Sequence, residues 1–407
     1  MLLTSCASTV TGTSGDAALD SSALDALSAD GPLVLDAMVD RPSDAEQVDP
    51  RCPQRPCRNA PLLRAREGAT WLVLPDGRTF WWGSRHIEPA PNALAVRQNT
   101  PTPGPRLSDD VLDFAAGAHH QCVLAAHPRR VICWGHNGEG QMGRGAFGGL
   151  EEPGVVPGLG EVEAIAAFGD ASWALTRAGS FFWGFPTLPG ARSRSPSPQR
   201  MAAAPDRAAR FATGESYEGW GYLTSDGEVF AFGGNRDGTA GSDQEAPVTV
   251  PTRVAGLADV IDYATGPQAR SCAVVASGAV YCWGQRSYLV SFASDLSATS
   301  VPERVVGIDD AVRVHLAAFR ACVLTRARAV RCWGSVNWDQ PTGIRISPPG
   351  PAYDLPPVRE LALGEDHICA LTMDGEVYCW GGNFGGQLGI QGFFRDSTVP
   401  RRVALPL

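Results

Sequence analysis

The sequence predicts an all-β protein, a seven-bladed β-propeller preceded by a disordered N-terminal tether. The composition favours turn-rich β structure, because only 19% of the residues are charged while glycine (46) and proline (32) are plentiful. An aromatic-glycine pair also recurs at intervals of about fifty residues, and each interval holds about four short strands, the content of one propeller blade. The seven pairs are Trp82-Gly83, Trp134-Gly135, Trp183-Gly184, Phe232-Gly233, Trp283-Gly284, Trp333-Gly334 and Trp380-Gly381.

The tether is expected over residues 7–50, which contain no aromatic residue. Residues 1–50 carry nine acidic side chains and a single basic one, Arg41. Such a segment cannot bury enough apolar surface to offset its ordering entropy, so it should be disordered. Since the whole chain has a net charge of −9, residues 51–407 are close to neutral. A near-neutral body argues against a nucleic-acid-binding protein, which needs a basic face.

The first six residues end in Leu3-Thr4-Ser5-Cys6, which resembles a bacterial lipobox. In that motif the cysteine is lipidated and becomes the first residue of the mature protein, so Cys6 is the expected lipid anchor. A complete secretory signal needs a basic start and an apolar run of about 7–15 residues before the cysteine. Only five residues precede Cys6, so residues 1–6 are either a truncated signal or an accidental match.

Residues 51–407 are expected to form the propeller, because each unit repeats one order of segments. The last unit runs from Val358–Gly364 into His367–Thr372, turns at Asp374-Gly375, and continues into Val377–Gly381 before a glycine-rich loop. A Pro-x-x-Val segment follows the loop in several units. The final one, Pro400 to Val403, has no eighth unit to enter, so we expect it to pair with blade one and close the ring. The other examples are Pro251 to Val254 and Pro302 to Val305.

Two loops identify the repeat more closely. Residues 135–143 read GHNGEGQMG and residues 381–389 read GGNFGGQLG. Together with the strands, they resemble the regulator of chromosome condensation (RCC-type) repeat over about residues 58–407. The match is specific in units two and seven, good in unit four, and weak in the loops of units one, three, five and six. The resemblance implies a seven-bladed propeller that acts as a binding scaffold. Some family members are exchange factors for a small GTPase and a secreted bacterial member inhibits β-lactamases, but no interface residue of either kind is matched here.

Eight cysteines occupy matched positions, two in each of four units. If Cys369 faces Cys379, a three-residue hairpin loop remains with Gly375 last, which is a favoured geometry because glycine adopts a left-handed conformation without steric cost. Directly opposite residues are within disulfide range. A metal site is the competing explanation, but no short C-x-x-C motif supports it. The expected pairs are Cys122–Cys133, Cys272–Cys282, Cys322–Cys332 and Cys369–Cys379, and Cys52 and Cys57 can form a fifth, local bridge.

In the three units that lack the cysteine pair, both positions of the pair hold other residues. Unit one has Trp71 and Trp81, and unit four has Gly221 and Ala231. In unit three, Trp173 is expected to face the segment Phe182–Trp183, one residue out of register. Paired cysteines predict an oxidising compartment, in agreement with the lipobox. We therefore expect an extracytoplasmic bacterial protein, secreted or lipid-anchored to the cell envelope.

No catalytic, cofactor or metal site is predicted. His120 and His367 recur at one repeat position, which favours a hydrogen bond between blades over catalysis. His119, His127 and His136 fall in loops of one blade, where a weak metal site is a minor alternative. Thr372–Gly375 superficially resembles the Asp-box of sialidases, so a propeller glycosidase acting on extracellular polysaccharide is the alternative function.

The main functional hypothesis is a monomeric, non-catalytic scaffold that binds a protein or a polysaccharide. Propellers recognise partners through rim loops, and aromatic anchors dominate protein interfaces. Any one of these rings can equally pack over a blade edge. The candidate binding residues are the loop aromatics Phe147, Tyr288, Trp338, Phe393 and Phe394.

Overall fold

The fold is taken from a computed structural model of the chain. By its contacts the chain divides into residues 1–47 and 48–407, and the description below concerns the second unit. The structure describes residues 60–85, 96–107, 110–186, 193–201, 204–205, 207–213, 219–243, 246–267, 269–285, 298–318, 320–335, 346–347, 350, 352–392 and 395–406. The expected lipid anchor Cys6, the Cys52–Cys57 bridge and four candidate aromatics (Tyr288, Trp338, Phe393 and Phe394) lie outside these residues.

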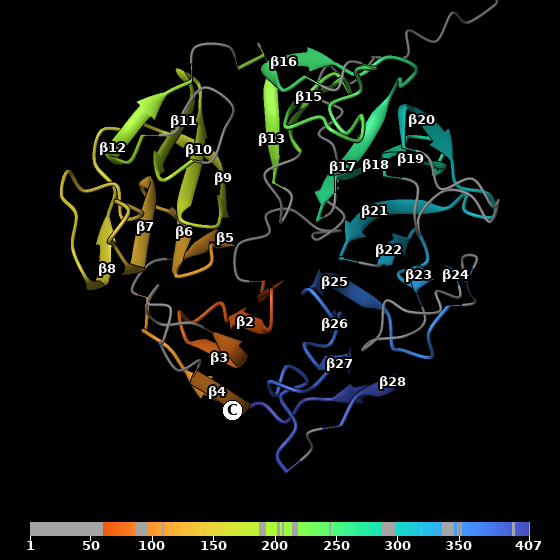
Figure 1. The fold of residues 1–407 in the computed structure, drawn as a ribbon. Helices are drawn as coiled ribbons and strands as arrows, with labels where there is room; N and C mark the ends of the chain where they lie inside the picture. Colours follow the sequence, from red (N-terminus) through yellow and green to blue (C-terminus); the bar gives the residue numbers. More distant parts are fainter. Residues whose placement is uncertain are drawn as a thin grey trace, which may run out of the picture. The chain divides into compact units, whose positions relative to one another are not determined.

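Seven four-stranded antiparallel sheets form the seven blades of a propeller around a central axis (Figure 1), as the sequence predicts. Within each blade the strands follow one another in chain order, from the innermost strand to the outermost. Blades one to three are β1 Leu62–Arg66, β2 Ala69–Val73, β3 Thr79–Arg85, β4 Val96–Pro103; β5 Val111–Ala116, β6 His120–Ala126, β7 Arg129–His136, β8 Leu150–Val155; and β9 Val162–Phe168, β10 Ala171–Thr176, β11 Gly179–Gly184, β12 Ser195–Arg200.

Blades four to seven follow the same plan. They are β13 Ala208–Thr213, β14 Trp220–Thr224, β15 Val229–Gly233, β16 Val248–Arg253; β17 Val260–Gly266, β18 Arg270–Val275, β19 Val280–Gly284, β20 Thr299–Arg304; β21 Ala311–Leu316, β22 Arg320–Thr325, β23 Val330–Ser335, β24 Ile346–Ser347; and β25 Val358–Leu363, β26 His367–Thr372, β27 Val377–Gly381, β28 Ser397–Arg402.

The central hairpin of blade seven has the register that the turn arithmetic predicts. In blade seven Cys369 lies directly opposite Cys379. The Thr372 N–H donates to the Glu376 carbonyl at 2.8 Å and the Gly375 N–H donates to the Thr372 carbonyl at 3.1 Å. Gly375 has a φ of 86°, the left-handed conformation that the third residue of this turn requires.

All four cysteine pairs of the repeat lie opposite each other in the same way. In the structure each pair forms a disulfide, with Cα atoms 4.1 Å apart. The substituted positions are also paired, Trp71 with Trp81 and Gly221 with Ala231. The expected slip in unit three is wrong, because Trp173 lies directly opposite Phe182. All seven hairpins therefore share one register.

The residue that follows the outermost strand packs into the seam with the next blade. Val254 and Val305 are both buried there, after β16 and β20. Val403, after β28, packs between blade seven and blade one, against Leu63, Trp82 and their neighbours. The repeat thus extends its hydrophobic core from each blade into the next, and the seams contain most of the large buried side chains.

The ring closes differently from the expectation. The segment from Pro400 to Val403 does not join blade one, because β28 pairs with β27 as the fourth strand of blade seven. Blade one already has four strands of its own, β1 to β4, and so needs no strand from the other end of the propeller. Closure comes from side-chain packing at the seam between blades seven and one, where Val403 and the partly buried Leu405 lie.

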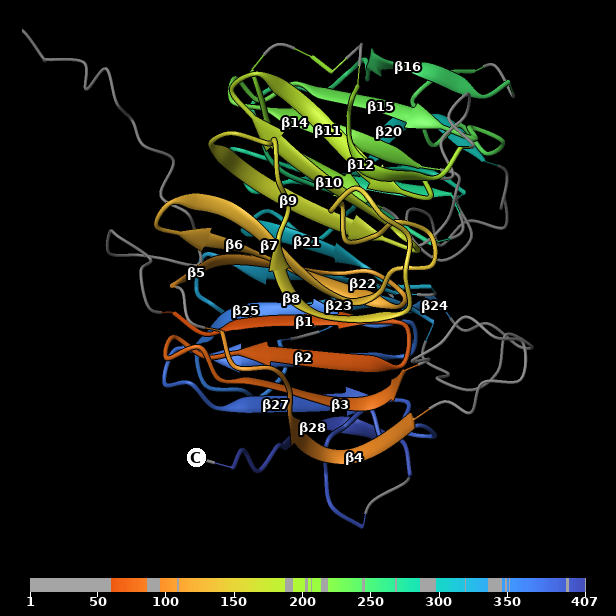
Figure 2. The ribbon, with the colours of Figure 1, turned by 90° about the vertical axis from the view of Figure 1, so that its left-hand side faces the viewer.

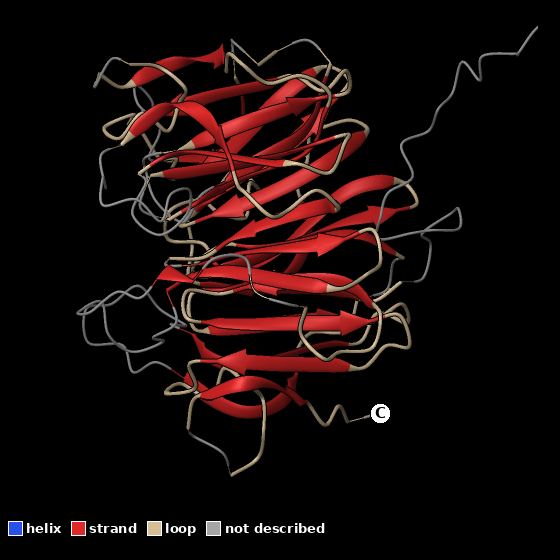
Figure 3. Cartoon of the chain, turned by 90° about the vertical axis from the view of Figure 1, so that its right-hand side faces the viewer, coloured by secondary structure: helices blue, strands red, loops and turns tan. Residues whose placement is uncertain are grey.

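The outer edges of the blades are protected by proline. Pro153, Pro251, Pro302 and Pro400 lie in the outermost strands β8, β16, β20 and β28. Proline lacks the N–H that a further strand would need, so these edges resist pairing with another chain. In the side views the strand axes are nearly aligned with one another across the thickness of the propeller, and loops lie at both faces (Figures 2 and 3). In the described part of the chain no helix is long and apolar enough to cross a membrane.

Candidate functional site

The first candidate site is a cavity on the axis of the propeller. It has a volume of about 560 Å³ and is lined by the innermost strands of all seven blades. In blades two to seven the innermost strand carries a β-bulge near its start. A bulge re-aims the side chains that follow it. The residue immediately after the bulge lines the cavity in each of these blades.

Five of those six residues are charged, and their signs alternate from blade four to blade seven. Arg64 of blade one lies among them and also lines the cavity. We call this set the charged belt. The bulge position of blade three is the exception, because it holds the uncharged Ala164. The belt consists of Arg64, Asp113, Arg210, Asp262, Arg313 and Glu360.

One half of the belt places an arginine between two carboxylates. The Arg64 guanidinium pairs with Asp113, at 2.6 Å, and with Glu360. It also donates to the carbonyl oxygens of Phe114 and Leu63, each at 2.9 Å. A second oxygen of Glu360 accepts the Leu63 N–H at 2.8 Å. These contacts join blades seven, one and two around the axis.

The other half reverses the signs, with a carboxylate between two arginines. Asp262, with 2% of its side chain exposed, pairs with Arg210 and lies 3.6 Å from Arg313. Its second oxygen accepts the Val314 N–H at 2.8 Å. Burial alone would raise the pKa of Asp262, but the two arginines outweigh it and hold the pKa below its usual range. These contacts join blades four, five and six.

The belt carboxylates are poor candidates for glycosidase catalysis. A glycosidase needs one carboxylic acid whose pKa is raised so that it can donate a proton. Asp262 has the opposite shift, and Arg64 holds both Asp113 and Glu360 in ion pairs. Among the described residues, the belt therefore forms two groups of ion pairs, one that connects blades seven, one and two and one that connects blades four, five and six.

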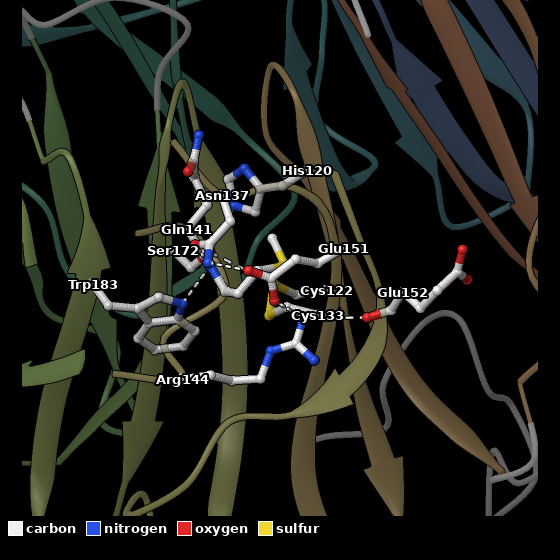
Figure 4. The surroundings of a disulfide bond; sticks show 11 residues. His120, Cys122, Cys133, Asn137, Gln141, Arg144, Glu151, Glu152, Ser172 and Trp183 are labelled. Atoms are coloured by element: carbon white, nitrogen blue, oxygen red, sulfur yellow. Dashed lines mark hydrogen bonds and ion pairs between the residues drawn. A yellow bond between two sulfur atoms is a disulfide. The ribbon is translucent and has the colours of Figure 1, made fainter. Parts of the chain in front are cut away.

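The repeated histidines also connect blades, as the sequence predicts. His120 of blade two is buried, and its Nε2 lies 2.6 Å from Ser172 Oγ of blade three. His367 of blade seven makes the matching contact with Thr70 of blade one, at 2.7 Å. Burial lowers the pKa of His120 to about 3, so the ring is neutral at physiological pH. Figure 4 shows His120 beside Ser172 and the Cys122–Cys133 disulfide.

The three loop histidines of blade two do not form a metal centre. His119 Nδ1 lies 2.8 Å from Asp170, and this hydrogen bond raises the pKa of His119. His136 Nδ1 accepts the Gly138 N–H at 3.1 Å. His127 lies beyond the far end of β6 from His119. No group of three or more metal-ligating side chains occurs among the described residues.

The glycine-rich loops of blades two, four and seven share a construction that explains their sequence. In blade two the buried Asn137 accepts the Met142 N–H at 3.1 Å, and Met142 is itself fully buried. The Gln141 carbonyl accepts the Trp183 indole N–H of the next blade at 2.7 Å. Asn235 and Asn383 accept the N–H groups of Ala240 and Leu388 in the same way. We call these three segments the clasp loops, because each loop packs at the seam with the following blade.

The second candidate site is the face of the propeller that carries the clasp loops, which we call the loop face. The tip of the blade-seven clasp loop holds Phe384, whose side chain is 77% exposed. The Arg97 guanidinium of blade one lies 4.8 Å from the centre of that ring. Phe147, one of the predicted binding aromatics, follows the blade-two clasp loop and is 52% exposed. Phe384 was not among the predicted residues, because its loop matched the repeat and so was read as structural.

Comparisons with known proteins agree with this architecture. The family model for the regulator of chromosome condensation (RCC1) repeat matches residues 358–387 and 374–407. The RCC1-like G exchanging factor-like protein of Mus musculus is 29% identical over 201 residues, which are 46% of this chain and 43% of that protein. The E3 ubiquitin-protein ligase HERC2 of Homo sapiens is 26% identical over 303 residues, 70% of this chain but 5% of that protein. This chain thus spans less than half the length of both relatives.

Solved structures show the same fold at low sequence identity. Prp20p from Saccharomyces cerevisiae superposes with a TM-score of 0.67 and 20% identity, over 85% of this chain and 88% of that one. Human WBSCR16 superposes with a TM-score of 0.65 and 24% identity, over 81% and 94%. The chain is therefore a seven-bladed β-propeller that carries regulator of chromosome condensation (RCC1) repeats.

Proposed function

We propose that this protein is a non-catalytic scaffold outside the cytoplasm, and that it binds a protein partner through its loop face. The observation that carries the proposal is the exposed pair of Phe384 and Arg97. Aromatic and arginine side chains are the types that contribute most binding energy at protein interfaces. The ring is presented by a loop whose own core, Asn383 and Leu388, is fully buried. A rigid support lowers the entropy that an anchor residue loses on binding.

The position of Phe147 supports the same face. Phe147 and Phe384 follow equivalent strands, β7 and β27, in the two blades that flank blade one. The two rings are the exposed aromatic residues among the large exposed apolar side chains of the described part of the chain. A partner that covers blades seven, one and two would meet both. Protein binding is also an activity that the fold supports, since the structure of Prp20p is described together with its binding to Gsp1p and histones.

The proposed location depends on the cysteines. Four disulfides within the blades suit an oxidising compartment and are rare in the cytosol. The motif Leu3-Thr4-Ser5-Cys6 would attach such a protein to a bacterial membrane through lipid on Cys6. We therefore place the scaffold in the bacterial cell envelope. Mass spectrometry of the membrane fraction would detect diacylglyceryl on Cys6 if this anchor is real, whereas an unmodified Cys6 would contradict it.

Photo-crosslinking in living cells tests the binding face directly. A benzophenone amino acid replaces Phe384 in the full chain, and a matched variant carries the same group at Val250. Val250 is 57% exposed but lies on the outer strand β16 of blade four, outside the three blades that the partner is proposed to cover. We expect position 384 to yield a discrete crosslinked band that contains a second protein, and position 250 to yield none.

Crosslinking from position 384 should also depend on the second exposed aromatic residue of the loop face. Replacing Phe147 with alanine should weaken the band from position 384, because the partner would lose its second aromatic contact. Equal crosslinking at positions 384 and 250 would contradict the proposed face. Absence of any protein adduct at 384, in cells where the variant is folded and exported, would contradict protein binding itself.

A further inference from the structure

The central cavity has a second layer of side chains above the charged belt. In five blades the residue two positions after the belt position on the innermost strand is alanine. All five small side chains belong to residues that line the cavity. Each of these alanines lies opposite the residue of the second strand that occupies the cysteine position of the repeat. The alanines are Ala115, Ala166, Ala212, Ala264 and Ala362, and the second strands are β6, β10, β14, β18 and β26.

Two blades replace this alanine, and both replacements are basic. In blade one it is Arg64, which lies opposite Trp71 and belongs to this layer by register, although its guanidinium reaches the belt carboxylates. In blade six it is His315, which lies opposite Cys322. Arg64 is already held by two carboxylates and two carbonyl oxygens. His315 follows Arg313 by two residues on β21, so both side chains lie on the same face of the strand, and both residues line the cavity. The layer therefore contains basic groups and alanines, with the carboxylates confined to the belt.

Arg210 adds a cationic group next to this layer. It lines the cavity from β13 with 42% of its side chain exposed. Its ion-pair partner Asp262 also accepts the Val314 N–H and lies 3.6 Å from Arg313. One carboxylate is thus shared by two guanidinium groups and a backbone amide. The half of the belt in blades four to six consequently has a formal charge of +1.

The charge of the whole lining has the same sign. Six arginines line the cavity against four carboxylates, so the formal charge of the wall is positive when His315 is neutral. Charge inside a concave wall of low dielectric attracts counter-ions more strongly than the same charge on an open surface. The arginines are Arg64, Arg66, Arg129, Arg210, Arg313 and Arg359, and the carboxylates are Asp113, Glu163, Asp262 and Glu360.

From this arrangement we propose that the central cavity binds a small multivalent anion, a phosphate or polycarboxylate group, against Arg210, Arg313 and His315. Guanidinium groups hold such oxyanions through pairs of N–H donors. The alanine layer provides the space, and about 560 Å³ is within the range of small-molecule sites. Burial lowers the pKa of His315 to about 4, and Arg313, Arg210 and Arg64 all contribute to that shift. A bound anion would reverse their effect and raise the pKa of His315. The site is separate from the loop face, so its test does not depend on the proposed function.

Isothermal titration of the full chain with inorganic phosphate, and separately with citrate, tests the site. We expect saturable binding with one anion per chain at near-physiological ionic strength, together with a rise in Tm. Arg210→Gln should weaken binding by about tenfold or more, because a charge-assisted hydrogen bond is lost. The matched control is Arg253→Gln, which removes an arginine paired with a carboxylate on the outer strand β16 of the same blade.

A steric variant keeps the test valid if Arg210→Gln disturbs the belt. Ala164 lines the cavity in blade three and is partly exposed, so Ala164→Leu would fill space without removing a charge. We expect weaker anion binding in Ala164→Leu and wild-type binding in Arg253→Gln. No saturable binding of either anion at millimolar concentration would overturn the proposal. Binding that is unchanged in both cavity variants would assign the anion to the surface and overturn it equally. Phosphate without citrate binding, or the reverse, identifies which of the two groups the cavity takes.

Discussion

Blades two and four differ at the pair of residues that lie opposite each other in the middle of the central hairpin. In blade two Cys122 and Cys133 lie opposite each other and are covalently joined. In blade four the opposite pair is Gly221 and Ala231. A Cβ atom at Gly221 would lie 2.6 Å from a ring carbon of Tyr263 in blade five. Tyr263 thus occupies the space that a cysteine side chain at position 221 would need.

Aromatic packing replaces the covalent link in that part of the ring. The seam between blades three and four holds a cluster of Phe168, Trp173, Trp220, Tyr222 and Phe232, all buried. The rings of Trp173 and Trp220 are 4.8 Å apart. Large rings bury much apolar area and contribute further through their mutual geometry. The central hairpin of a blade can therefore be stabilised either by a short disulfide or by large side chains that pack against it from the adjoining blade. Substitutions at the two kinds of hairpin test it.

The largest expected effect follows from removing an aromatic ring between blades three and four. Trp220→Ala should lower the free energy of unfolding by about 3–5 kcal/mol, because it removes a fully buried tryptophan and leaves a cavity. Urea denaturation monitored by circular dichroism measures the change. The control is Phe147→Ala, whose exposed side chain should leave stability nearly unchanged. A small effect in Trp220→Ala would contradict the assignment of stability to the aromatic cluster.

The next largest effect concerns a blade whose central hairpin carries a disulfide. Replacing Cys369 and Cys379 together with alanine should cost about 2–3 kcal/mol, the loop-entropy value for a bridge that closes so short a loop. The double variant avoids a free buried thiol. A reducing agent should then destabilise the wild-type protein more than the variant. Equal sensitivity of the two proteins to reduction would show that this bridge contributes nothing.

A third variant tests why blade four lacks a bridge. Gly221→Ala should destabilise the protein by about 1–3 kcal/mol, since the added methyl group meets Tyr263 and the Phe230 carbonyl oxygen. Adding Tyr263→Phe to the Gly221→Ala variant should restore little of the lost stability, because a ring carbon as well as the hydroxyl is in contact with the added methyl group. Tyr263→Leu in the Gly221→Ala background should recover more. Stability unchanged in Gly221→Ala alone would contradict the steric explanation.

The smallest effect at neutral pH concerns the buried histidine of blade two. The folded pKa of His120, about 3, lies below its ordinary value of 6.5. The unfolded chain therefore binds the proton first, and stability falls as the pH drops below about 6.5, by up to about 1.4 kcal/mol per pH unit. His120→Gln should flatten this part of the stability profile, whereas His127→Gln at an exposed turn should not. Parallel profiles for His120→Gln and wild type would disprove the buried, neutral state.

The sequence predicted the parts of the fold that depend on contacts within one unit. The hairpin register followed from the three-residue turn at Gly375, and the contact between blades at His120 followed from its recurrence. Ring closure was predicted wrongly, because Pro400 to Val403 has the same sequence pattern as earlier outer strands, and its pairing depends on whether blade one is already complete. The slip expected at Trp173 was also wrong, because Phe182, the residue before the Trp-Gly pair, is the one that lies directly opposite.

The charged belt was missed for a different reason. Successive members lie about one repeat apart along the chain, and they pair with residues of neighbouring blades, as Asp262 and Glu360 do. Their orientation also depends on a bulge that periodicity alone does not reveal. The alternation of sign from unit four to unit seven was the available signal, but the belt residues lie at different distances from their aromatic-glycine pairs, so aligning the units on those pairs alone would not have superposed them.

The most direct test of the account is non-reducing peptide mapping of the full chain isolated from its own cells with free thiols blocked at lysis. The account predicts that Cys122–Cys133, Cys272–Cys282, Cys322–Cys332 and Cys369–Cys379 are each recovered as a linked pair, since they are opposed in the hairpins. Such a result would support both the structural role of the cysteines and a location outside the cytoplasm. Recovery of these eight cysteines as blocked free thiols would contradict both.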